Sequence, residues 1–124
     1  MITNKIGERD LDFAVLYLLA THNTEIIDTT KLKALIFDFV NPGGINLAPL
    51  LHRNDTAIDQ IIRNIISHRF DSSNNIINRQ LVTYDGLRLR ISDKGKSYLD
   101  NMMKSYNNLQ IMKYKQMLYS QLLA

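Results

Sequence analysis

Residues 81–96 have the sequence LVTYDGLRLRISDKGK, in which two short runs of strand-forming residues flank a turn. The run 82–84 favours a β-strand, and the Asp-Gly pair after it is a strong signal for a two-residue hairpin turn. Beyond the turn, three apolar residues alternate with Arg88 and Arg90, so one face is apolar and the other carries two guanidinium groups. Because two strands alone are marginally stable in water, the sequence predicts that the apolar face packs on neighbouring helices.

Three segments before the hairpin carry apolar residues at three- and four-residue spacing, which is typical of helices with one buried face. A capping residue precedes the second and the third of these segments, and the sequence NPGG at 41–44 ends the second. Residues 25–27 (EII) are a candidate third strand for the hairpin, whereas Ile45–Asn54 shows no clear pattern. The expected helices cover residues 8–22, 30–40 and either 57–67 or 57–70.

The last part of the chain predicts one long helix, from Lys94 or Lys96 to Leu122, with a broad apolar band. A helix of about 27 residues is roughly 40 Å long, which is more than a small domain covers by itself. An uncovered apolar helix usually binds a partner, most often a second copy of the same chain. We therefore expect a homodimer interface formed by Leu99, Met102, Met103, Tyr106, Leu109, Met112, Leu118 and Leu122.

Composition limits the class of protein. With 124 residues, 45% of them apolar and 22% charged, the chain is expected to form one globular domain. It has no cysteine, which excludes disulfides and thiolate metal sites. No apolar run reaches the roughly 18 residues that a membrane helix needs, and the beginning of the chain lacks a signal-peptide pattern. We expect a cytoplasmic protein with no membrane partner.

The formal net charge is only +3, but it is unevenly distributed along the chain. Residues 1–52 hold four basic and six acidic side chains, whereas residues 53–96 hold eight basic and five acidic ones. Residues 97–124 add three basic side chains and one acidic. A basic C-terminal two-thirds favours a polyanionic partner, of which nucleic acid is the most common.

Signatures of enzymes and of metal sites are absent from the sequence. There is no nucleophile elbow, no phosphate-binding glycine loop and no pair of acidic residues that suggests acid–base catalysis. The three histidines, His22, His52 and His68, lie in separate predicted elements without metal-ligand spacing. We therefore expect a protein that is not an enzyme, with no cofactor, no metal and no small-molecule ligand.

A basic hairpin that follows a helical region and is closed by Ser92-Asp93-Lys94-Gly95 resembles the wing of winged helix-turn-helix proteins. With its long final helix, the chain is similar to small dimeric regulators of the PadR or replication-terminator type. The resemblance implies a mainly α protein with a small β-hairpin (α+β class). Residues 1–96 would form the winged-helix domain, and 97–124 a dimerisation helix of that same domain.

The resemblance further implies sequence-specific binding of double-stranded DNA, with one reading helix from each subunit in successive major grooves. The protein would then be a dimeric transcriptional regulator or a component of a plasmid or phage nucleoprotein complex. The alternative is a winged-helix module that binds other proteins and not DNA.

Two placements of the reading helix are compatible with the sequence. If it covers residues 57–70, the DNA-binding residues are Arg63, Asn64, Ser67, His68 and Arg69. If it is a short helix just before the hairpin, as the winged-helix order favours, they are Ser72, Ser73, Asn74, Asn75, Asn78 and Arg79. Amide side chains suit adenine and arginine suits guanine in either case. The wing would add phosphate contacts from Arg88, Arg90 and Lys94.

Overall fold

The computed structural model describes residues 8–22, 26–41, 43–44 and 46–122. The described part is mainly helical with a small antiparallel sheet, as the sequence predicts for the α+β class. None of its helices is long and apolar enough to cross a membrane. Its elements are α1 (Glu8–Thr21), β1 (Ile26–Asp28), α2 (Thr29–Val40), α3 (Ala48–Leu51), α4 (Ala57–Ser67), β2 (Val82–Tyr84), β3 (Arg88–Ile91), α5 (Asp93–Ser105) and α6 (Asn108–Leu122).

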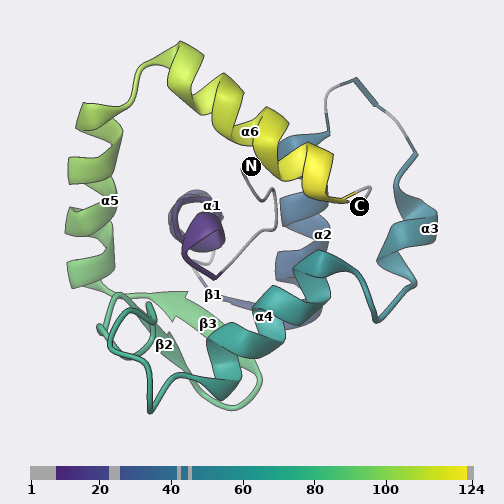
Figure 1. The fold of residues 1–124 in the computed structure, drawn as a ribbon. Coiled ribbons are helices and arrows are strands. Elements are labelled where there is room, and N and C mark those ends of the chain that lie inside the picture. Colours follow the sequence, from purple (N-terminus) through teal and green to yellow (C-terminus); the bar gives the residue numbers. More distant parts are fainter. Residues whose placement is uncertain (1–7, 23–25, 42, 45, 123–124) are drawn as a thin grey trace, which may run out of the picture.

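Helix α1 runs through the middle of the molecule, and the other elements surround it (Figure 1). It contacts α2, α4, α5 and β3. A helix with neighbours on every side needs apolar residues around its whole circumference, not along one stripe. The sequence of α1 meets this need, because it has fully buried residues at five positions: Leu11, Ala14, Val15, Leu16 and Leu19.

The described strands form one antiparallel sheet in the order β1-β3-β2. Strand β1 therefore supplies the third strand that residues 25–27 predict, although it spans Ile26–Asp28 and Glu25 lies outside the described residues. In the register of the sheet, Leu89 pairs with Ile27 on one side and with Tyr84 on the other. Leu89 and Ile91 are buried while Arg88 and Arg90 are exposed, so the predicted alternation of the hairpin is confirmed.

The turn of the hairpin lies one residue later than the sequence predicts. The backbone N–H of Asp85 donates to the carbonyl of Arg88, which makes Gly86 and Leu87 the two central residues. Gly86 has a φ of +97°, a conformation that glycine adopts without steric cost. The carboxylate of Asp85 accepts the N–H groups of Leu87 and Arg88 and so holds the turn. Leu87 is consequently at the tip, 66% exposed, and not on the apolar face.

Helix α4 is positioned by a capped start and by a contact from α2. Thr56 and Asp59 form a complete capping box at its N-terminus, as the sequence predicts. Ahead of it, the one-turn helix α3 occupies part of the segment without a clear pattern. The ammonium group of Lys33, on α2, donates to the backbone carbonyls of Leu51 and Arg53. These bonds fasten the connection between α3 and α4 to the body of the domain.

Residues 72–80 do not form the short helix that one of the two placements of the reading helix requires. Residues 68–80 form successive turns after the end of α4 at Ser67. The side chain of Asn75 explains this conformation, because it is buried and its amide nitrogen donates to the carbonyl of Ile65 at 2.7 Å. Its oxygen accepts the backbone N–H groups of Ile77 and Asn78. Asn75 thus replaces helical hydrogen bonds with bonds to its own side chain.

The prediction of a single long C-terminal helix is wrong, because the segment forms two helices, α5 and α6. The chain bends at Tyr106 and Asn107, and α6 returns over the domain to contact α2 and α4 (Figure 1). Asn107 and Gln110 form reciprocal 2.8 Å hydrogen bonds that start a new helix. Leu118 is fully buried inside its own chain. The apolar band is therefore covered in part by the domain itself, whereas Met103, Tyr106, Leu109 and Met112 remain exposed in this chain.

Candidate nucleic-acid interface

Helix α4 is strongly amphipathic. Its apolar side is buried against α1 and α2, and consists of Ile58, Ile61, Ile62 and Ile65. On the other side, Arg63, Ser67 and Gln60 are exposed and Asn64 is partly exposed. Gln60 donates to Asn64 at 3.2 Å and accepts from Arg63 at 3.4 Å, so these three side chains form a row along the exposed face. Gln60 was not predicted as a site residue, although its position on the polar face of the helix indicates it.

The guanidinium group of Arg63 is held in place on this face. It donates to the backbone carbonyl of Asn54 at 2.9 Å. The bond joins the middle of α4 to the segment that precedes its N-terminus. An arginine that is already oriented loses less side-chain entropy when it binds a planar acceptor such as a guanine edge.

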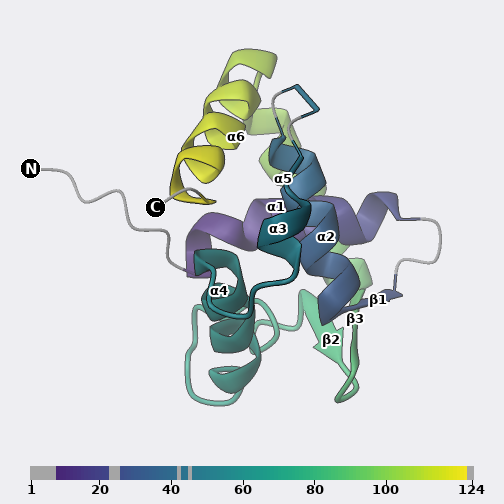
Figure 2. The ribbon, with the colours of Figure 1, turned by 90° about the vertical axis from the view of Figure 1, so that its right-hand side faces the viewer.

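The C-terminal end of α4 lies beside the hairpin. The guanidinium carbon of Arg69 is 4.5 Å from the ring centroid of Phe70 and 5.4 Å from that of Tyr84, on β2. Arg69 also donates to the carbonyl of Ile66 at 2.6 Å, which fixes it to the last turn of the helix. Figure 2 shows α4 and the strands at the same end of the molecule. Of the predicted helix residues, the structure therefore brings Arg69 into contact with the hairpin.

Phe70 is the most conspicuous residue that the sequence analysis missed. It is 81% exposed, which is unusual for a phenylalanine, and it lies directly after the arginine that it contacts. An exposed aromatic ring beside a guanidinium group offers a flat surface for stacking with a base or a sugar. Its position at the end of an amphipathic helix, outside the apolar stripe, was the signal in the sequence.

The two wing arginines have different surroundings. Arg88 forms an ion pair with Asp85 at 3.2 Å, and both side chains are about half exposed. The N–H groups of Arg88 and Leu87, with the nearby guanidinium, lower the pKa of Asp85, so this carboxylate remains charged beside Arg88. Arg90 is exposed in the middle strand, in register with Ile26 on one side and Thr83 on the other. Among the described residues, an ion pair therefore neutralises Arg88 but not Arg90.

Among the residues predicted between α4 and the hairpin, several have structural partners. The buried Asn75 is not accessible to a ligand, which corrects its assignment as a DNA-binding residue. Asn78 donates to the carbonyl of Arg69 at 3.1 Å, and the guanidinium of Arg79 lies over the ring of Tyr98 at 4.7 Å.

The remaining predicted residues lie at the surface around this interface. Nδ1 of His68 is 3.2 Å from the carboxylate of Asp71. Ser73 and Asn74 are exposed, Ser72 is partly exposed, and Lys94 is exposed in the first turn of α5. Across the described ranges, no three histidine or acidic side chains are grouped so that they could hold a metal ion.

Comparison of the chain with models of protein families, with curated proteins and with solved structures finds no match.

Proposed function

We propose that the chain is a winged-helix protein that binds double-stranded DNA sequence-specifically, with α4 as the reading helix. The order of the elements supports the proposal. In winged-helix proteins the reading helix precedes the first wing strand, and α4 is the last described helix before β2. The wing of such proteins often pairs with a third strand, and β1 pairs with β3 in that position.

The observation that carries the proposal is the contact of Arg69, two residues after the end of α4, with Tyr84 on β2, which brings the C-terminal end of α4 next to the hairpin that carries Arg88 and Arg90. Arg63 has the donors that recognise guanine, and the amides of Gln60 and Asn64 have the donor and acceptor that recognise adenine. Arg90 on the hairpin would contact the phosphate backbone at the same time.

The first test is fluorescence anisotropy with a labelled random duplex, at salt concentrations from about 50 to 200 mM. The affinity should fall steeply as the salt concentration rises, because each neutralised phosphate releases counterions. The double variant Arg88→Ala/Arg90→Ala should reduce the slope of log Kd against log salt by about 2. The matched control, Lys104→Ala/Lys113→Ala, also removes two exposed charges, but from α5 and α6, and should leave the slope unchanged.

The second test addresses specificity. Bound duplexes are selected from a random pool with the wild-type protein and with Arg63→Ala/Asn64→Ala. The helix variant should lose preference at particular base positions, whereas the wing variant should keep the same motif with weaker binding. If the wild-type protein does not bind duplex at tens of micromolar and about 50 mM salt, the proposal is wrong.

We further infer that two copies pair through the bend between α5 and α6, which would give a dimeric regulator or nucleoprotein component. Leu99 and Leu118 belong to the core of the chain itself, and the side chain of Leu122 lies outside the described part. Met102 is partly buried in that core. The residues that remain for a partner are the exposed ones: Met103, Tyr106, Leu109 and Met112.

Leu109 and Met112 are the most exposed members of this set, at 57% and 55%. Leu109→Lys/Met112→Lys should convert a dimer to a monomer in sedimentation velocity without loss of helicity. A wild-type protein that sediments as a monomer at every concentration would exclude the pairing. If the monomer also fails to bind DNA, the same exposed apolar residues favour the alternative function, a module that binds another protein.

A further inference from the structure

A pocket of about 270 Å³ lies in the angle between α1, α5 and α6. None of the residues that line it belongs to α4 or to the hairpin, so it is separate from the proposed DNA contact. A cavity of about 150 Å³ accommodates a benzene molecule in a protein interior. This pocket therefore has room for an aromatic ring with a substituent.

The walls of the pocket are largely apolar and aromatic. The ring of Phe13 meets those of Tyr106 and Tyr114 edge-on, with centroids 5.6 and 5.4 Å apart. Met102 and Met117 close two other sides. Fixed aromatic edges favour a flat ligand, and methionine side chains adapt to its outline.

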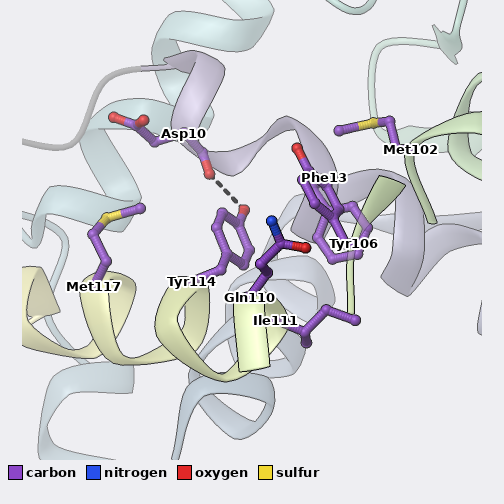
Figure 3. A pocket seen from close by; sticks show the side chains of 8 residues that line it. All are labelled: Asp10, Phe13, Met102, Tyr106, Gln110, Ile111, Tyr114 and Met117. Atoms are coloured by element: carbon purple, nitrogen blue, oxygen red, sulfur yellow. Dashed lines mark hydrogen bonds between the residues drawn. The ribbon is translucent and has the colours of Figure 1, made fainter. Parts of the chain in front are cut away.

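The hydroxyl group of Tyr114 is not available to a ligand. It donates to the carbonyl of Asp10 (Figure 3) and accepts the N–H of Ala14 at 3.2 Å. The hydroxyl therefore bridges two backbone groups that lie one turn apart in α1. Burial strongly raises the pKa of this phenol, which keeps it neutral. Tyr114 thus forms a fixed wall and not a recognition group.

Gln110 supplies an oriented amide among the polar groups of the lining, which also include the hydroxyl of Tyr106 and the carboxylate of Asp10. Its amide oxygen accepts the backbone N–H of Asn107 at 2.8 Å, which orients the side chain. Its amide nitrogen has no hydrogen-bond partner among the described residues. Figure 3 shows this amide among the rings that line the pocket. A ligand here would meet one oriented N–H donor, on a side chain that is itself exposed, beside largely apolar walls.

We propose that the pocket binds a small planar aromatic molecule that carries a hydrogen-bond acceptor, such as a carbonyl oxygen, with Gln110 Nε2 as the donor. The aromatic walls and the two methionines bind the ring, and Gln110 selects the acceptor. This site is independent of the proposed DNA binding, and its test needs no nucleic acid.

The test uses acetophenone and α-methylstyrene, which have nearly the same shape but differ in the carbonyl oxygen. The full chain is labelled at its methionine methyl groups and titrated with each probe by NMR. The methyl signals of Met102 and Met117 should shift saturably, while those of Met103 and Met112, which do not line the pocket, serve as internal controls. Acetophenone should bind more tightly by about threefold to tenfold, the ratio expected for one neutral hydrogen bond.

Gln110→Glu is the discriminating variant, because a carboxylate still accepts the Asn107 N–H but has no donor for the ligand. It should remove the preference for acetophenone and leave binding of α-methylstyrene nearly unchanged. Ile111→Trp should fill the pocket and abolish binding of both probes, and thermal unfolding confirms that each variant is folded. The proposal is overturned if the Met102 and Met117 signals do not saturate, if Met112 shifts equally, or if Gln110→Glu keeps the preference.

Discussion

Lys33 of α2 and Asp59 of α4 form an ion pair almost shielded from solvent, with Nζ 3.0 Å from Oδ1 and side-chain exposures of 9% and 11%. Asp59 also accepts the N–H and the hydroxyl group of Thr56. The ammonium group of Lys33 is thus bonded to α4 as well as to the carbonyls that end α3. One side chain therefore joins α2 to the segment that follows α3 and to the first turn of the proposed reading helix.

Replacement of Lys33 by methionine tests this role. Met fills a similar volume but leaves Asp59 and two carbonyls without their shared donor, so we expect a loss of about 3 kcal/mol in the free energy of unfolding. The measurement is urea denaturation followed by circular dichroism. Lys31→Met, at an exposed position of the same helix, is the control and should change stability by less than about 0.5 kcal/mol. Equal stability of the two variants would contradict the role of Lys33.

Acidic pH should weaken the same contact. Burial by itself would raise the pKa of Asp59, but hydrogen bonds from Thr56 and Lys33 outweigh it and lower the pKa. A lowered pKa in the folded state means that this stabilisation is complete above the ordinary aspartate value of about 4 and is lost as the pH falls through the lowered pKa. The stability difference between wild type and Asp59→Asn should therefore shrink below about pH 4. A difference that grows in acid would reverse the sign and refute this account.

Gly95 is required where α5 begins. A methyl group at this position would lie 2.1 Å from the carbonyl oxygen of Leu81 and 2.8 Å from Cγ1 of Ile91. Gly95→Ala should lower the Tm by roughly 5–10 °C in a thermal melt, because the helix must move away from the sheet. Gly43→Ala is the matched control, since nothing lies within 4 Å of its added methyl group. A Tm of Gly95→Ala equal to that of this control would show that α5 can shift without cost.

The buried hydroxyl of Tyr114 stabilises the contact between α6 and α1. Tyr114→Phe keeps the ring and removes the bonds to Asp10 and Ala14, so we expect a loss of about 1 kcal/mol, measured by urea denaturation. Tyr119→Phe, on the same helix, controls for the general loss of a phenol and should be close to neutral. If neither variant changes stability, the backbone groups of Asp10 and Ala14 must form other hydrogen bonds when the hydroxyl group is removed.

Substitution of Phe70 is expected to weaken DNA binding without a loss of folding stability. Because its ring is exposed, Phe70→Ala should change the free energy of unfolding by less than about 0.5 kcal/mol. If the end of α4 contacts duplex, the same variant should weaken DNA binding at least threefold, measured by anisotropy at fixed salt. Unchanged affinity would place Phe70 outside the interface, while the rest of the α4 face could still be tested through Arg63.

Local patterns were sufficient for the elements with a clear period. The alternation around Arg88 and Arg90 predicted the hairpin, and the isoleucine stripe of α4 predicted its buried side. Local patterns were insufficient where contacts between residues distant in sequence determine the structure. The burial of Lys33 depends on carbonyls about 20 residues away in sequence, and that of Asn75 on a carbonyl of α4. Polar residues of this kind are expected at the surface, so their structural roles are visible only in the fold.

The bend at Tyr106 and Asn107 shows a second limit. The apolar band of the C-terminal segment continues across it without glycine or proline, so periodicity predicts one helix. The local signal was Asn107 followed by Gln110, a capping pair in the middle of a helical pattern. Whether this capping pair starts a new helix depends on whether the domain has an uncovered face on which α6 can pack. The sequence alone does not reveal such a face. The sequence also left open which of two segments forms the candidate interface. Because residues 72–80 form turns, the candidate interface is now placed on α4.

The central position of α1 has a consequence for synthesis of the protein. Its partner Tyr114 follows Asp10 by 104 residues, so the ribosome produces the central helix well before the helix that completes its enclosure. During that interval α1 has no complete shelter from water, and a chain with such distant contacts pays a large loop-closure entropy before it gains them. Until α6 is synthesised, the apolar surface of α1 can be buried only by elements that precede α6 in the chain, such as α2 and α4.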